Sequence, residues 1–173
     1  MEIIDLYNGK REKLNKTFIR ENGDPEDGEY KLSVHVWILN SKGEFLIQKR
    51  KENLKRNPGK WAFTGGIVDA GETSLEGAMR ESKEELGIDI DKDKIELLLS
   101  FKREHGFVDV WLVKDDIEIN KLILQKTEVS EAKWVSIKEL SKIIDSNQFV
   151  KSIDLYFELF IKLLRKCHNL EIK

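Results

Sequence analysis

Apolar residues are distributed along this chain in short runs bounded by turn residues, a pattern typical of β-strands. The clearest run covers residues 31–39, and turn residues at 40–43 separate it from a second run at 44–49, which predicts a hairpin. Similar runs predict further strands at residues 2–7, 17–21, 61–64, 94–103, 107–113 and 134–135.

Three segments predict helices, and the one that begins after Thr73 is the best defined. Thr73 and Glu76 have the spacing of a capping box, in which each side chain accepts a hydrogen bond from the other's backbone amide. Gly87 follows at the position where helices commonly end in a left-handed residue. Residues 137–144 predict a short helix, and residues 149–167 predict a long amphipathic one.

One face of this first helix is mostly apolar and predicts contact with the core, and it consists of Leu75, Ala78, Met79, Ser82 and Leu86. Ser82 lies at the centre of the stripe. We therefore expect the helix to approach the sheet closely there, with the serine hydroxyl bonded to the helix carbonyl one turn back.

The mixture of strands and helices predicts an α/β fold in which a mixed β-sheet is sandwiched between helices (α/β/α). At 173 residues and 20.2 kDa, the chain has the length of one domain. Within this single domain of residues 1–173, we expect residues 1–29 to form an N-terminal β extension and residues 146–173 to form a C-terminal helix.

Composition narrows the function classes. A net charge of −2, with lysines and acids interleaved, predicts no general affinity for nucleic acid. The single cysteine, Cys167, excludes a disulfide framework and suits a reducing cytosol. Because we see neither a secretory signal nor an apolar run of membrane-spanning length, we expect a cytoplasmic protein with no membrane partner.

The most informative polar pattern is a group of glutamates, Glu81, Glu84 and Glu85, directly behind Arg80. At about 100° per residue they share one side of the helix, mostly opposite the apolar stripe. Like charges at these spacings repel one another, but a bound divalent cation removes that penalty, because Mg²⁺ prefers carboxylate and phosphate oxygens. The cluster indicates metal-assisted chemistry on a phosphate ester or anhydride, and a solvated acidic helix face is the alternative.

The surrounding residues favour the first interpretation. Gly66 is followed after five residues by Glu72, and after seven more by the segment 80–88 (RESKEELGI). This series resembles the signature of the Nudix hydrolases at every charged and glycine position over residues 66–88. Ser82 is the one departure, since an aliphatic residue or alanine is usual there. The resemblance implies the Nudix fold over about residues 30–145.

The resemblance also assigns roles to the matching residues. Arg80 matches the arginine that orients the carboxylates, and Glu72 matches a glutamate that pairs with that arginine or acts as a further metal ligand. The carbonyl of Gly66 often completes the coordination shell in the family. The metal-binding carboxylates of the family match Glu81, Glu84 and Glu85.

The reaction implied by the resemblance is hydrolysis of a diphosphate bond. Its substrate is a nucleoside diphosphate linked to another moiety or a related small diphosphate metabolite, and its cofactor is Mg²⁺, with Mn²⁺ as the alternative. One carboxylate that is not fully committed to the metal, Glu81 or Glu128, accepts the proton of the attacking water. The residues leave that choice open.

Glu128 is a candidate because members of the family often use one further acidic residue. That residue lies in a distant loop, shortly before a tryptophan that opens a strand. Glu128 lies six residues ahead of Trp134 and is the candidate metal ligand or general base. Glu131 is the next candidate. An ordinary surface glutamate is the alternative interpretation of Glu128.

Residues 48–60 contain a basic cluster that precedes the glycine-rich turn. Arg50, at the end of a predicted strand, is the candidate for binding the diphosphate, because a guanidinium fork matches phosphate geometry better than a lysine does. Lys49 lies beside it. Trp61 is a candidate for stacking on a base or an isoprenoid, with core packing as the alternative.

Two other functions remain as alternatives. Residues 34–40 and the N-terminal extension resemble isopentenyl-diphosphate isomerase, a member of the same superfamily, but Gly65 and Ile67 stand where that enzyme has its cysteine and histidine. A non-catalytic sensor of a nucleotide metabolite is the alternative from a different class. Paired chains are common in the family, which leaves a monomer and a homodimer open.

Overall fold

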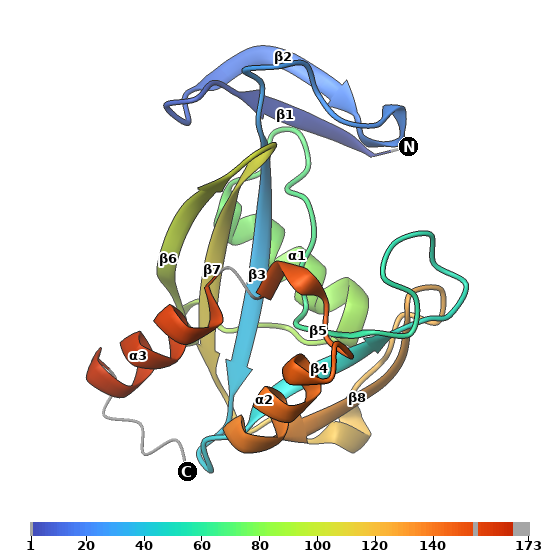
Figure 1. Cartoon of the computed structure of the whole chain (residues 1–173), viewed down its shortest axis with the longest axis vertical. Coiled ribbons are helices and arrows are strands. Elements are labelled where there is room, and N and C mark those ends of the chain that lie inside the picture. Colours follow the sequence, from blue (N-terminus) through green and yellow to red (C-terminus); the bar gives the residue numbers. More distant parts are fainter. Residues whose placement is uncertain (1, 154–155, 168–173) are drawn as a thin grey trace. The chain divides into compact units, whose positions relative to one another are not determined.

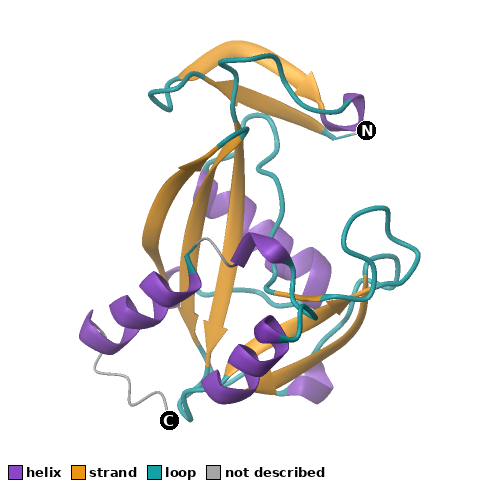
Figure 2. Cartoon of the chain, in the orientation of Figure 1, coloured by secondary structure: helices purple, strands orange, loops and turns teal. Residues whose placement is uncertain are grey.

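The computed structural model describes residues 2–153 and 156–167. The chain forms two compact units, one made of Met1–Trp37 and Thr64–Val113, and the other of Ile38–Phe63 and Lys114–Lys173. Both units contain strands and helices (Figure 2), which confirms the predicted α/β class.

The first unit opens with an N-terminal hairpin (Figure 1). Its strands β1 (Ile3–Tyr7) and β2 (Lys13–Ile19) pair antiparallel as a separate two-stranded sheet. The strand predicted at residues 17–21 is therefore wrong in its bounds. β2 begins four residues earlier and stops at Ile19, because Arg20–Asn22 turns into a short 3-10 helix.

Three longer strands form the main sheet of the first unit, in the order β3 (Lys31–Leu39), β7 (Gly106–Lys114) and β6 (Ile95–Arg103). β6 and β7 pair antiparallel along their full lengths. All three lie within one residue of their predicted bounds. A 3-10 turn at Lys92–Lys94 leads into β6.

The helix α1 (Ser74–Leu86) has the ends that the sequence predicts. The Thr73 hydroxyl accepts a bond from the backbone amide of Glu76 at 3.2 Å, and the Glu76 carboxylate accepts one from the Thr73 amide at 2.8 Å. At the other end, Gly87 takes up the left-handed conformation, with a φ of 72°. The capping box and the glycine stop are both confirmed.

The apolar stripe of α1 is only partly core. Ser82 is completely buried, and its hydroxyl donates to the carbonyl of Ala78 at 2.9 Å, as predicted. Ala78 and Leu86 are buried as well, whereas Leu75 and Met79 are half-buried.

The second unit is organised around β4 (Phe45–Arg50), which follows the turn at residues 40–43 as predicted. β4 pairs antiparallel with β5 (Trp61–Ala62), with β8 (Val129–Val135) and with the last two residues of β3. The strand predicted at residues 134–135 is thus only the end of a longer one. A 3-10 turn at Ile119–Lys121 precedes β8.

Two helices complete this unit, α2 (Ile137–Asp145) and α3 (Phe157–Cys167). The helix predicted over residues 149–167 is wrong in its first part. Phe149 forms a β-bridge with Trp61 and packs its ring 5.2 Å from that of Phe63, and Lys151–Ile153 is a 3-10 turn. The remainder of the predicted C-terminal helix, residues 168–173, lies outside the described residues. None of the described helices has the length and apolar character needed to span a bilayer.

Candidate functional site

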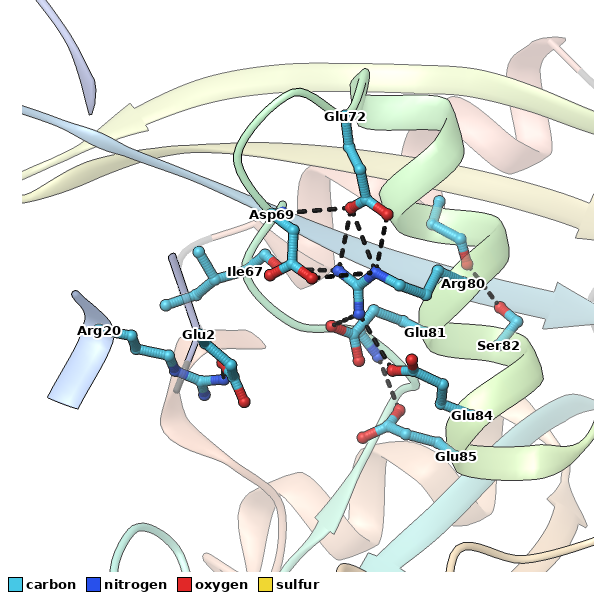
Figure 3. Close-up of polar contacts among 12 residues, drawn as sticks. Glu2, Arg20, Ile67, Asp69, Glu72, Arg80, Glu81, Ser82, Glu84 and Glu85 are labelled. Atoms are coloured by element: carbon cyan, nitrogen blue, oxygen red, sulfur yellow. Dashed lines mark hydrogen bonds and ion pairs between the residues drawn. The ribbon is translucent and has the colours of Figure 1, made fainter. Parts of the chain in front are cut away.

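Arg80 lies at the centre of a group of carboxylates in the first unit (Figure 3). Its Nε and Nη2 donate to Glu72 at 2.9 and 3.1 Å. Its Nη1 donates to Glu81 at 2.9 Å and to Glu84 at 3.1 Å. The carboxylate of Asp69 lies 3.6 Å from Nε. One guanidinium thus contacts four acidic side chains, and the orienting role of Arg80 stays a prediction.

The loop before α1 brings Glu72 to this group. The backbone amide of Asp69 donates to the Glu72 carboxylate at 3.1 Å, and the Glu72 amide donates to the Asp69 carbonyl at 3.1 Å. Arg80 Nη2 also donates to the carbonyl of Ile67 at 3.1 Å. Loop and helix are therefore joined through one charged network.

Two glycines allow the loop to lie against α1 and β3. A Cβ at Gly66 would clash with the carboxylate of Glu81, and a Cβ at Gly65 would clash with the carbonyl of Val34. The Gly65 amide donates to the carboxylate of Glu85 at 3.0 Å. The carbonyl of Gly66 accepts a bond from the Val34 amide at 2.9 Å, which leaves its second lone pair for another partner.

The glutamates are less exposed than the sequence predicts. Glu84 is on the solvent side, with its side chain 49% exposed, but the Glu81 side chain is 12% exposed and Glu85 is only 3% exposed. The prediction that the three glutamates lie mostly opposite the apolar stripe of α1 is therefore correct only for Glu84. The reason is that the loop at residues 65–72 covers a second side of α1, so the helix is buried on two sides.

This burial changes the ionisation of the group. Burial raises the pKa of Glu81 to about 7, although the charge and hydrogen bond of Arg80 lower it. Burial likewise raises the pKa of Asp69 above its ordinary value. The pKa of Arg80 itself is raised by its bonds to Glu72 and Glu81, which outweigh the effect of burial, so the arginine stays charged. Four carboxylates facing one cation leave an excess of negative charge.

A divalent cation fits the chemistry of this donor set, which consists of hard oxygen ligands. In the described arrangement, however, Glu72, Glu81 and Glu84 turn to Arg80, and the parts of the chain that the structure describes contain no three His, Cys, Asp or Glu side chains arranged to hold a metal ion. The metal roles of Gly66, Glu72, Glu81, Glu84 and Glu85 therefore remain predictions.

The other predicted site residues lie in the second unit. Glu128 is half-buried directly before β8, and its carbonyl accepts a bond from the Lys51 amide at 2.8 Å. Arg50 ends β4, and its Nε donates to the carbonyl of Arg56 at 3.2 Å. The catalytic or metal role of Glu128 and the substrate role of Arg50 stay predictions.

Lys49 and Trp61 face each other across the pairing of β4 with β5. Trp61 is 8% exposed, and Lys133 Nζ lies 4.3 Å from the centre of its ring. One face of this indole is therefore covered by a cation, and little of the side chain reaches solvent. The contribution of Lys49 and Trp61 to substrate binding also stays a prediction.

Sequence reasoning missed two acids that contact Arg80 or the loop before α1. Asp69 contacts the guanidinium from the glycine-rich turn, and Asp5, on β1, accepts a bond from the amide of Gly71 at 2.7 Å. The signal for Asp5 was present, because it is a charged residue inside an apolar strand, where it requires partners.

Comparisons with known proteins identify the family of this chain. The model of the NUDIX domain family matches residues 29–155. A protein named an uncharacterized Nudix hydrolase in Listeria monocytogenes is 41% identical over 152 residues, which cover 87% of this chain and 89% of the relative.

Solved structures show the same fold. DR0079 from Deinococcus radiodurans is similar with a TM-score of 0.77 and 24% identity, over 94% of this chain and 99% of that one. The MutT protein from Methanosarcina mazei Go1 is similar with a TM-score of 0.60 and 33% identity, over 79% of this chain and 96% of that one.

Proposed function

The chain belongs to the Nudix hydrolase family, whose enzymes cleave pyrophosphate bonds in nucleoside diphosphate derivatives, and from this premise we propose a specific reaction for it. The substrate is a nucleoside diphosphate linked to a second moiety, or a related small diphosphate metabolite. Its diphosphate bond is hydrolysed with Mg²⁺ as the cofactor and Mn²⁺ as the alternative.

The observation that carries the proposal is the network around Arg80. Four carboxylates contact a single guanidinium, and Glu85 lies buried on the next turn of the same helix. Like charges gathered in this way repel one another, and a further bound cation would offset that repulsion. Burial of Glu81 makes the compensation more necessary, because a desolvated carboxylate is costly to ionise.

In the proposed site, Glu81, Glu84 and Glu85 hold the cation, and the Gly66 carbonyl and Glu72 complete the set of candidate ligands. Bound Mg²⁺ supplies charge neutralisation at the phosphate oxygens and makes a water more acidic. Arg80 keeps the carboxylates in position by its bonds to Glu72, Glu81 and Glu84.

The remaining work of the chain is proton transfer and substrate orientation. Glu81 or Glu128 accepts the proton of the attacking water. Arg50, with Lys49 beside it, binds phosphate oxygens through its guanidinium fork. Because phosphoryl transfer depends mainly on positioning and charge stabilisation, a carboxylate-rich metal site supplies most of what the reaction requires.

The decisive experiment is a panel of nucleotide sugars, ADP-ribose, oxidised nucleotides and prenyl diphosphates, tested with saturating magnesium. We expect cleavage of the diphosphate bond of at least one compound by the wild-type protein, and cleavage slowed by roughly 10³-fold in Glu85→Gln, measured as phosphate-containing products. Saturable binding without cleavage by the wild-type protein would support the sensor alternative and overturn the hydrolase proposal.

A further inference from the structure

The first strand of the N-terminal hairpin holds the loop that precedes α1. The Ala70 amide donates to the carbonyl of Ile3 at 2.8 Å, and the Gly71 amide donates to the carboxylate of Asp5 at 2.7 Å. Ala70 and Gly71 directly precede Glu72 in the chain. These two bonds therefore determine the position of the backbone from which Glu72 reaches Arg80.

Asp5 is held firmly enough to serve as an anchor. Only 8% of it is exposed, and its carboxylate pairs with Lys13 Nζ, on the neighbouring strand, at 2.5 Å. Burial acts to raise the pKa of Asp5, but the bonds from Lys13 and Gly71 outweigh it and lower the pKa overall. Asp5 is thus a charged acceptor with two donors, and bonds to a charged acceptor are about twice as strong as neutral ones.

A continuous series of contacts leads from this anchor to the acidic group. Gly71 positions Glu72, whose carboxylate accepts bonds from both the Asp69 amide and Arg80. Arg80 in turn contacts Glu81 and Glu84. A shift of the loop at Gly71 is therefore transmitted to the candidate metal ligands through charged contacts.

The family model matches residues 29–155, so the hairpin lies before the matched segment. Arg20, which follows β2, pairs with Glu2 of the same hairpin and is drawn to the left of the acidic group in Figure 3.

We propose that Asp5 is a positioning residue for the hydrolytic reaction, and that the N-terminal hairpin forms part of the active site by holding the loop at Ala70 and Gly71. This inference rests on the proposed function. It assigns to the hairpin a role that goes beyond stabilising the fold.

The test is Asp5→Asn in the full chain, with Glu12→Gln as the matched control. Glu12 is an exposed acid on the same hairpin, and its carboxylate accepts a bond from the Asn8 amide group at 2.7 Å. Both substitutions remove one charge without changing side-chain size. We expect amide hydrogen exchange at Ala70 and Gly71, measured without metal, to become roughly tenfold faster in Asp5→Asn and to be unchanged in Glu12→Gln.

The kinetic readout separates positioning from stability. For Asp5→Asn we expect kcat to fall about 10- to 100-fold, the range found for partners of metal ligands, with KM within about twofold of wild type. Asp5→Glu should recover part of kcat. Wild-type exchange and kcat in Asp5→Asn would overturn the inference, as would faster exchange with an unchanged kcat.

If Asp5→Asn lacks the wild-type circular dichroism spectrum, Lys13→Gln takes its place, with the same exchange pattern and a smaller loss of kcat. Unchanged exchange and kcat in that variant would also overturn the inference. Failure of the proposed function is distinguishable, because it appears as a wild-type protein that cleaves no compound of the panel. The exchange measurement reports on the loop in either case.

Discussion

The two units of the molecule use charge in different ways. In the first, Arg80 is 22% exposed and joins four carboxylates, and the buried Asp109 pairs with Arg11. In the second, Arg50 bonds a neighbouring loop carbonyl, and pairs such as Glu118 with Lys121 are largely solvent-exposed. A buried charge that bonds several partners is held in one arrangement, whereas a solvent-exposed charge remains free to move. The first pattern suits the chemistry proposed for the group around Arg80.

The largest expected effect tests the first unit. Glu84→Gln and Glu85→Gln should each lower kcat by roughly 10³-fold, about 4 kcal/mol of transition-state stabilisation, because a neutral amide is a poor ligand for Mg²⁺. The fold should survive, as judged by circular dichroism. Lys83→Gln is the control, since Lys83 directly precedes Glu84 on the exposed side of α1 and pairs with Asp89. Near-normal rates in either glutamate variant would show that the assignment is wrong.

Glu128 provides the next test, because it would extend the chemistry into the second unit. As general base, Glu128→Gln should lower turnover by about 10²-fold with saturating magnesium, while the melting temperature changes little. Glu131→Gln serves as the comparison. Wild-type turnover in Glu128→Gln would remove this residue from the mechanism and leave Glu81 as the base.

A stability measurement compares buried with exposed pairs directly. Arg11→Met should reduce the free energy of unfolding by about 2 kcal/mol, because it leaves Asp109 buried without its cation. Lys121→Met, in an exposed pair of the second unit, should cost less than about 0.5 kcal/mol. Urea unfolding at pH 7 measures both, and equal losses would remove the distinction.

The same pair has a predictable pH dependence. Burial acts to raise the pKa of Asp109, but bonds from Arg11, Ser100 and Ser74 lower it below its ordinary value of 3.8. A lowered pKa in the folded state means that this stabilisation is complete above that value and is lost as the pH falls through the folded-state pKa. The advantage of wild type over Arg11→Met should therefore shrink below about pH 4. If wild type remained more stable than Arg11→Met by the same free energy of unfolding in acid, the lowered pKa of Asp109 would be contradicted.

The smallest effect concerns recognition. Arg50→Gln should raise KM by about tenfold and leave kcat nearly unchanged, because it removes a bond to the substrate that is equally strong in the ground state and the transition state. Lys49→Gln should act in the same direction but less. Lys55→Gln, at an exposed position in the loop that follows β4, is the control. An unchanged KM in Arg50→Gln would place the phosphate site elsewhere.

Local features were readable from the sequence. The capping box at Thr73, the stop at Gly87 and the bond of Ser82 to the helix backbone depend on residues within one turn of each other, so spacing alone predicts them. The prediction of a helix over residues 149–167 is wrong in its first part for the opposite reason. Phe149 forms a β-bridge with Trp61, which is far away in the chain. The hydrophobic periodicity of the sequence does not reveal such a partner.

The sequence by itself determined the family, the acidic group and its arginine, because these follow from residue types at fixed intervals along one helix. Only the tertiary structure decided how that group is surrounded. Burial of Glu81 and Glu85, and the attachment of Gly71 to Asp5, arise between segments separated by up to 66 residues. Such contacts depend on how segments distant in the sequence pack together in the folded chain, and local propensity does not specify them.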